Sequence, residues 1–150
     1  GAHPTFKVPL VPDTAYEDYF LYFNKKECAG IWPLSAGGQV EPAPVPFLEK
    51  THELPLKKSL FYNDALVFKD LASTAISICS KRTPHGLTLA FEGFPYMGIW
   101  AAKDADFVCI EPWCGIADSV NASGALEEKE GINRLAPGKT FERTWTATIF

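Results

Sequence analysis

The sequence predicts an all-β protein, an antiparallel β-sandwich, and two observations carry this prediction. Aromatic residues make up 13% of the chain, which also contains 12 Pro and 11 Gly. Aromatic residues favour strands, whereas proline and glycine favour tight turns. Several short segments also alternate apolar and polar residues, which is the two-residue period of a half-buried strand. Short strands joined by tight turns favour a structure in which one sheet packs on another.

The clearest strand signals predict a hairpin. The segment Thr74–Lys81 alternates and places Ile76 and Ile78 on one face. A Pro-His-Gly turn follows, and the segment Gly86–Phe91 then alternates again. Two alternating runs separated by such a turn are typical of paired antiparallel strands.

The remaining elements are weaker predictions. Further strands are expected at Tyr19–Phe23, Ala65–Phe68, Gly98–Trp100, Phe107–Glu111 and Phe141–Phe150. The last of these is expected to be long and half-buried, because large apolar residues alternate there with threonines. Helix is expected only as single turns at Thr14–Tyr19 and Leu126–Glu130, and the proline-rich segment Val40–Phe47 as an extended surface connection or an edge.

Composition excludes several classes of function. A chain of 150 residues can bury a core without disulfide or metal staples. The net charge of −4, with scattered basic residues, argues against a nucleic-acid-binding surface, and no apolar run approaches a membrane span. No CxxC is present, and the spacing of the cysteines does not match a zinc site. We therefore expect free thiols, no structural metal and a cytoplasmic location. The cysteines are Cys28, Cys79, Cys109 and Cys114.

Two polar residues in apolar surroundings are candidates for proton transfer. Glu111 ends an apolar run, so its carboxylate is expected to be partly desolvated, which would raise its pKa towards that of a general base. A strand-end carboxylate that points into solvent explains the same pattern. His3 lies close to Phe6 and Val8, and an imidazole suits acid–base chemistry near neutral pH. The alternative for His3 is a structural or solvent-exposed residue near a terminus.

Other residues suit sugar binding. Asp64 precedes the predicted strand Ala65–Phe68, where Asn-Asp is ordinary turn chemistry, but a carboxylate there can also accept hydrogen bonds from sugar hydroxyls. Trp100 and Trp113 can stack on the face of a sugar, although most tryptophans in such a sheet belong to the core. The chain has no phosphate-binding glycine loop, no serine nucleophile elbow and no HExxH motif.

Several longer segments together resemble the aldose 1-epimerase (galactose mutarotase-like) superfamily, and most closely its LacX-like or hexose-phosphate mutarotase-like branch. They follow the order expected for the family, and the likeness runs from Leu54 to the end of the chain and includes the opening Gly1–Leu10, which together is well over half the chain. These segments are GAHPTFKVPL (Gly1–Leu10), LPLKKSLFYNDALVFKDL (Leu54–Leu71), FEGFPYMGIW (Phe91–Trp100), FVCIEPWCGIADSV (Phe107–Val120) and EKEGINRLAPGKTFERTW (Glu128–Trp145).

The resemblance implies a role for each candidate residue. His3, in GAHPTF, matches the histidine that protonates the ring oxygen of the sugar, and Glu111, in CIEPW, matches the glutamate that removes the proton from the C1 hydroxyl. Asp64, in NDALVF, looks like the aspartate that binds a sugar hydroxyl. The Pro-Trp pair that follows Glu111 departs from the classical members, so Trp113 is expected to contact a sugar whose identity stays open. No cofactor is implied. If the pair acts on one hemiacetal, the imidazole nitrogen and the carboxylate oxygen should lie within about 8 Å of each other.

The resemblance also concerns the extent of the chain. Family members are roughly twice as long, and this chain starts almost on His3 and has a single methionine, Met97. We therefore expect residues 1–150 to be the C-terminal half of one mutarotase-like domain, with no internal boundary. The expected partners are an aldose or hexose phosphate and the N-terminal half of the same protein; a homodimer is the alternative if open strand edges pair. The isolated half is expected to be inactive.

Two other functions fit the same sequence. A non-catalytic carbohydrate-binding β-sandwich would bind a sugar in the same cleft without accelerating the exchange of its anomers. A purely structural sandwich would do neither. Sugar binding and anomer exchange, measured separately, discriminate among the three hypotheses.

Overall fold

The predicted all-β class is confirmed. The computed structural model describes residues 1–150 and contains nine strands, three single-turn 3-10 helices and no α-helix. No helix is long and apolar enough to cross a lipid bilayer. The elements in chain order are β1 (Thr5–Lys7), η1 (Tyr16–Asp18), β2 (Tyr19–Ile31), β3 (Val45–Pro55), η2 (Lys58–Phe61), β4 (Leu66–Lys69), β5 (Ala75–Ser80), β6 (Leu87–Ala90), β7 (Tyr96–Trp100), β8 (Phe107–Trp113), η3 (Leu126–Glu128) and β9 (Thr146–Ile149).

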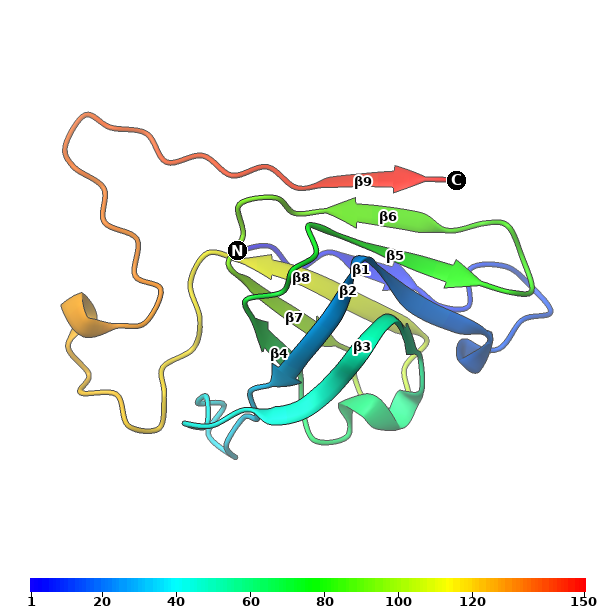
Figure 1. Ribbon diagram of the computed structural model, residues 1–150, viewed down its shortest axis with the longest axis horizontal. Coiled ribbons are helices and arrows are strands. Elements are labelled where there is room, and N and C mark those ends of the chain that lie inside the picture. Colours follow the sequence, from blue (N-terminus) through cyan, green and yellow to red (C-terminus); the bar gives the residue numbers. More distant parts are fainter.

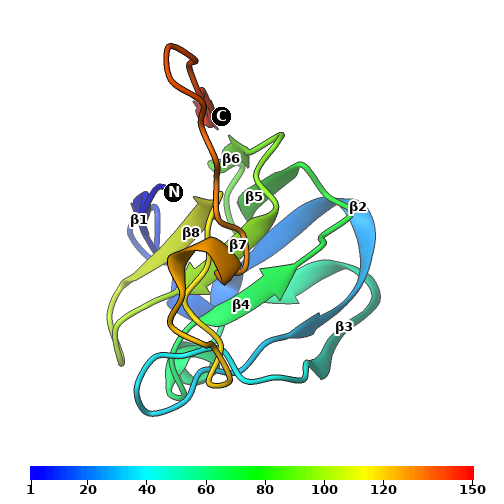
Figure 2. The same ribbon diagram turned by 90° about the vertical axis from the view of Figure 1, so that its left-hand side faces the viewer.

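The strands form two antiparallel sheets (Figures 1 and 2). One sheet has four strands in the order β1-β8-β7-β4, and the other has five in the order β3-β2-β5-β6-β9. A single cluster of 21 buried apolar residues joins the sheets, with Leu21 and Ile78 from the five-stranded sheet and Phe68, Ile99 and Ile110 from the four-stranded sheet. Ile110 of β8 points into this core. Because side chains alternate along a strand, those of its neighbours Cys109 and Glu111 lie on the outer face of the four-stranded sheet.

The predicted hairpin is confirmed as the pair β5–β6, whose register runs from Ala75 opposite Ala90 to Ile78 opposite Leu87. The shorter strand predictions are also confirmed, as parts of β2, β4, β7 and β8, and helical turns occur in both predicted places. The last three residues of the proline-rich segment begin β3, an edge strand, which agrees with the expectation of an extended connection or an edge. The sequence pattern did not show that this strand continues to Pro55. Edge strands tolerate proline, and Pro46 and Pro55 both lie in β3.

The prediction of a long half-buried strand over Phe141–Phe150 is wrong. Only Thr146–Ile149 forms a strand, β9, and all four residues are exposed. The only neighbour of β9 is β6, and their ladder ends where Ala90 pairs with Thr146. The preceding residues therefore have no strand to pair with, and they run along an arm that projects from the body of the molecule (Figures 1 and 2).

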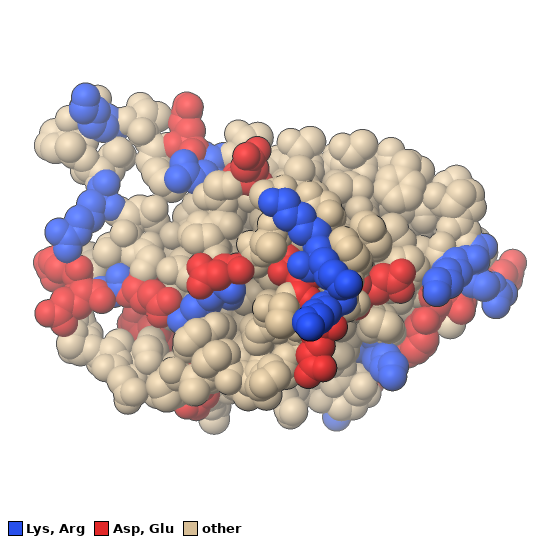
Figure 3. Space-filling view, in the orientation of Figure 1, with Lys and Arg blue, Asp and Glu red and all other residues tan.

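On the face that Figure 3 shows, basic side chains form a short row near the centre, and acidic side chains lie beside this row and in a group at the left-hand edge. Neither sign of charge covers the whole face. This distribution agrees with the net charge of −4 and with the scatter of Lys and Arg along the sequence.

Candidate functional site

The candidate site lies on the outer face of the four-stranded sheet, where β1 and the residues before it pair with β8. Thr5 lies opposite Cys109 in the β1–β8 register. The pairing continues towards the N-terminus, because the Ala2 N–H donates to the Pro112 carbonyl at 3.0 Å. An antiparallel register that pairs residue 5 with residue 109 also places His3 opposite Glu111.

The structure brings the two predicted proton-transfer residues into contact. His3 Nδ1 lies 2.8 Å from Glu111 Oε2, which is an ion pair when the imidazole is protonated. The His3 side chain is 59% exposed, whereas that of Glu111 is only 6% exposed. The distance is well inside the separation that the hemiacetal chemistry requires. The Glu111 side chain is thus buried against the sheet, whereas the His3 side chain is exposed to solvent.

The imidazole ring also contacts Cys109. His3 Nε2 lies 3.4 Å from Cys109 Sγ, and this thiol in turn lies 3.2 Å from Thr5 Oγ1. Trp100 packs edge-on against the imidazole, with 6.0 Å between the ring centroids. Both imidazole nitrogens are therefore engaged, one by the carboxylate and the other by the thiol.

Burial sets the protonation behaviour of Glu111. Desolvation raises the pKa of its carboxyl above the ordinary value of 4.5, and this effect exceeds the opposing effects of the His3 charge and of hydrogen bonds from Trp113 and His3. A buried carboxylate is a stronger proton acceptor than one in water, because the charged form is destabilised. The environment of Glu111 therefore suits a general base.

Glu27 shows what a structural buried carboxylate looks like in the same protein. It is 2% exposed, and its two oxygens accept the backbone N–H groups of Ser73 at 2.7 Å and Ala72 at 3.1 Å. Glu27 thus satisfies the backbone between β4 and β5, and it forms no ion pair such as the one between His3 and Glu111.

The raised pKa of Glu111 predicts a pH-dependent cost in stability. A carboxyl with a higher pKa in the folded state than in the unfolded state binds more protons when folded, so stability falls as pH rises from 4.5 through the folded pKa. Glu111→Gln removes this cost. We expect the melting temperature of the variant to exceed that of the wild type at pH 7 and to approach it at pH 4. Thermal unfolding followed by circular dichroism measures both differences.

The control variant is Glu92→Gln, which removes a charge from an exposed position. An advantage of Glu111→Gln that is the same at both pH values would contradict the assignment of the cost to a buried carboxylate.

The Trp113 side chain lies beside the His3–Glu111 pair. Gly98 lies opposite Glu111 in the β7–β8 register, and a Cβ at Gly98 would lie only 2.4 Å from Trp113 Cζ2, so the indole occupies the space that a side chain would fill. Trp113 also lines a cavity of about 420 Å³, together with Gly1, Leu34, Val40, Val67, Gly115, Ile116, Ala117 and Lys129. Trp113 thus borders both the acid–base pair and an apolar cavity of the size that small ligands occupy.

Asp64 lies in the turn before β4, away from the pair. Its Oδ1 accepts the N–H of Ala65 at 2.7 Å, and its φ of 80° is typical of a turn. Glu111 pairs with Gly98 across β7 and β8, and Gly98 in turn pairs with Val67 on β4. Asp64 precedes Val67 by three residues, which places it about 10 Å along the chain from the level of Glu111. A role for Asp64 in sugar binding therefore stays a prediction, and it requires a ligand that reaches this end of β4.

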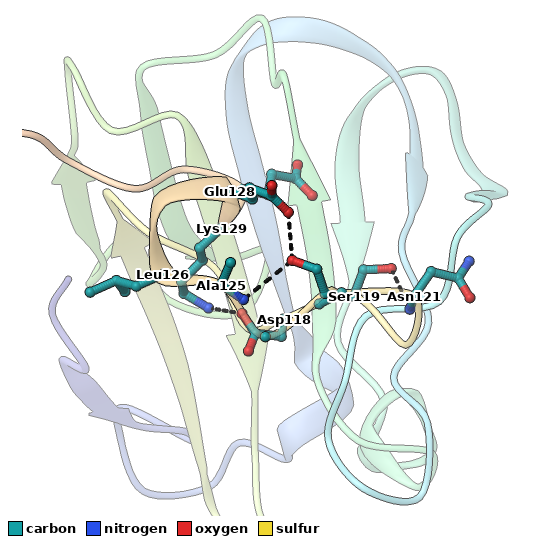
Figure 4. A pocket seen from close by; sticks show the side chains of 11 residues that line it. Asp118, Ser119, Asn121, Ala125, Leu126, Glu128 and Lys129 are labelled. Carbon is teal, nitrogen blue, oxygen red and sulfur yellow. Dashed lines mark hydrogen bonds and ion pairs between the residues drawn. The ribbon is translucent and has the colours of Figure 1, made fainter.

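A second cavity, of about 370 Å³, lies within the loop over residues 118–130 (Figure 4). Its polar groups pair with one another: Lys129 with Asp118, and the Ser123 hydroxyl with Glu128 at 2.6 Å. This cavity contains none of the candidate catalytic or sugar-binding residues His3, Asp64, Glu111 and Trp113. The His3–Glu111 pair therefore stays the candidate functional site.

Sequence reasoning missed three residues of the site. It expected Cys109 only to be a free thiol, and it gave no role to Thr5 or Gly98. One signal was present: the run Phe107–Trp113 is apolar at nearly every position, which is typical of a strand that is buried on both faces. Such a strand must have a covered outer face, and that is where Cys109 and Glu111 lie.

An all-β sandwich that carries a histidine–glutamate pair agrees with what the sequence resemblance implied for a galactose mutarotase-like protein, and the structure adds that the pair lies on the outer face of one sheet. No family model matches the chain. The chain is 33% identical to the chromosomally encoded and the plasmid-encoded LacX proteins of Lactococcus lactis subsp. lactis, over 99% of its own length and 51% of theirs.

Solved structures agree with this relationship. A galactose mutarotase-related enzyme from Lactobacillus acidophilus is 28% identical and superposes with a TM-score of 0.88, covering 99% of this chain and 50% of that protein. A galactose mutarotase-like protein from Lactobacillus casei, 22% identical, has the same fold with a TM-score of 0.78 over 98% of this chain and 51% of that protein. The resemblance to the galactose mutarotase-like superfamily is thereby confirmed, and the chain spans about half the length of the relatives it matches.

Proposed function

We propose that the protein carrying this chain is an aldose 1-epimerase, which interconverts the α and β anomers of an aldohexose or hexose phosphate. The observation that supports this proposal most is the 2.8 Å contact between His3 Nδ1 and Glu111 Oε2. The two oxygens that exchange protons in a hemiacetal are bonded to the same carbon. An acid and a base in contact with each other can therefore reach both oxygens together.

The reaction requires two proton transfers in each direction. In ring opening, Glu111 takes the proton of the C1 hydroxyl, and the electrons of that O–H bond form the carbonyl. The bond between C1 and the ring oxygen breaks, and the ring oxygen takes a proton from His3. Rotation about the C1–C2 bond presents the other face of the aldehyde, and closure reverses both transfers. Each positioned proton transfer contributes about 10²–10⁴-fold to the rate.

The surroundings of the pair suit this chemistry. The raised pKa of Glu111 increases its basicity, and imidazole is a side chain that commonly transfers protons near neutral pH. Trp113 offers an apolar surface for a sugar ring, since the C–H faces of sugars pack against aromatic side chains. Asp64 would add a hydrogen bond to a hydroxyl.

We propose further that residues 1–150 are the C-terminal half of a single mutarotase-like domain. The chain spans about half of its relatives, and β9 leaves Ile149 84% exposed and Phe150 54% exposed. Apolar residues on an outer strand are stabilised when another layer covers them. The N-terminal half of the same protein is the proposed covering layer, and a second copy of the chain is the alternative. The four cysteines are free thiols, which fits a cytoplasmic location.

One observation favours a non-catalytic sugar-binding role. Both nitrogens of His3 are engaged, by Glu111 and by Cys109, so no imidazole nitrogen faces an empty space. Proton donation to a sugar requires the exposed imidazole to turn away from one of these partners. A binding module would keep the observed arrangement.

The two functions are separated by measuring binding and exchange on the same full-length protein. We expect the approach of freshly dissolved α-anomers to equilibrium, followed by polarimetry, to accelerate with protein concentration for at least one sugar in a panel of glucose, galactose and their 6-phosphates. Tryptophan fluorescence reports binding of each sugar separately, because Trp113 and Trp100 border the pair. Binding without acceleration would favour the binding module, and neither effect would contradict both proposals.

A further inference from the structure

The contact between Cys109 and the proposed acid–base pair adds chemistry that mutarotation does not use. His3, Cys109 and Glu111 each offer one ligand atom, and these nitrogen, sulfur and oxygen atoms all lie within 4.8 Å of one another. The spacing of cysteines along the sequence could not show this group, because its members come from two paired strands. Cys109 and Glu111 are two residues apart on β8, and His3 precedes β1.

We propose that His3, Cys109 and Glu111 form a binding site for a thiophilic divalent cation such as Zn²⁺ or Cd²⁺, which blocks the site when bound. Tetrahedral zinc has bonds of about 2.3 Å to sulfur and about 2.0–2.1 Å to nitrogen, so its ligand atoms lie about 3.3–3.7 Å apart. The Nε2–Sγ distance of 3.4 Å already has this value. Small side-chain movements bring the three atoms to the separations that the metal requires.

The backbone holds two of the ligands in advance. Cys109 and Glu111 are two residues apart on β8, so their side chains lie on the same face of the sheet. Pairing with β1 holds the neighbouring strand opposite them. The third ligand, His3, has a side chain that is 59% exposed. It therefore leaves access from solvent and a fourth coordination position for water.

The ligand set determines which metals fit. Thiolate and imidazole favour zinc and its softer relatives, whereas Mg²⁺ and Ca²⁺ prefer oxygen ligands. Binding requires the thiolate of Cys109, so the S–H bond breaks and its proton passes to solvent, while sulfur donates an electron pair to the metal. His3 donates the lone pair of one nitrogen, and Glu111 donates through a carboxylate oxygen.

The consequence for activity rests on the proposed mutarotase function. A bound cation takes the lone pair with which His3 would exchange a proton and neutralises the charge with which Glu111 would accept one. A site that holds Zn²⁺ is thus expected not to catalyse anomer exchange.

The test measures metal binding directly, so that its outcome does not depend on any activity. The protein carrying Cys28→Ser is used as the reference, because Cys28 is the exposed thiol and would bind Cd²⁺ by itself. We expect Cd²⁺ to produce the ultraviolet charge-transfer band of a cadmium–thiolate bond at one equivalent, and Mg²⁺ to produce no band. Addition of Cys109→Ser should abolish the band, whereas Cys79→Ser, as the matched control, should leave it unchanged.

Two further variants keep the test decisive if Cys109→Ser unfolds. His3→Ala changes an exposed side chain and should weaken Zn²⁺ binding at least tenfold in isothermal titration calorimetry, and Glu111→Gln should do the same. A cadmium–thiolate band that persists in a folded Cys109→Ser variant would overturn the proposal, and so would Zn²⁺ affinity that is equal in His3→Ala and the reference protein. Either result would leave the proposed mutarotase function intact, because that function is measured by anomer exchange without metal.

Discussion

Glu111→Gln in the full-length protein should lower kcat for anomer exchange by about 10²–10⁴-fold, which corresponds to about 2.7–5.5 kcal/mol of transition-state stabilisation. Gln keeps the shape of the side chain and can still contact His3, but it cannot accept the proton of the C1 hydroxyl. The change should appear in kcat and much less in KM, because the proton transfer belongs to the transition state and not to sugar binding. Polarimetry at several sugar concentrations separates the two parameters.

Glu92→Gln is the matched control for this variant, since it makes the same chemical change at an exposed position. Its kcat should equal that of the wild type. If Glu111→Gln keeps the wild-type kcat as well, Glu111 is not the proton acceptor and the proposed mechanism is wrong.

His3→Asn should lower kcat by a similar factor of about 10²–10⁴. Asn can place an N–H group where Nδ1 now contacts Glu111, so the contact with the carboxylate is kept while the acid is lost. His85→Asn, in an exposed turn, is the control. The variant with both His3→Asn and Glu111→Gln tests whether the residues act as a unit.

In a unit, removal of either member stops the same reaction path, so the loss in the double variant should be close to that of the worse single variant rather than to the product of the two losses. A double variant whose loss equals the product would mean that the two residues act independently, which would contradict a shared role at one hemiacetal.

The sequence predicted the centre of the fold better than it predicted its edges. The alternation in the β5–β6 hairpin is a local pattern that both sheet pairing and core packing reinforce, so it was read correctly. The pattern Phe141–Phe150 alternates equally well, yet only its last five residues pair, those of β9 with β6 and Phe150 with Gly86, because the length of a strand depends on the strand beside it. Alternation indicates which residues can share a face, but it does not show whether anything covers that face.

The candidate site residues divide in the same way. His3 and Glu111 were singled out by their apolar surroundings, their roles were proposed from a family resemblance, and the register between β1 and β8 brings them together. Cys109 had no such signal, because its importance comes from a contact across two strands with His3. Spacing along the chain shows ligands that lie on one element, and it is silent about ligands that only the fold assembles.

The most direct test of the central proposal is exchange NMR on an equilibrium mixture of α and β anomers, with the full-length protein and its His3→Asn/Glu111→Gln double variant compared at equal sugar occupancy. The proposal predicts cross-peaks between the anomeric protons that build up rapidly with the wild type. With the double variant they should build up only at the uncatalysed rate, although the sugar still binds. Equal exchange rates for the two proteins would place the chemistry elsewhere and contradict the assignment of His3 and Glu111 as the acid–base pair.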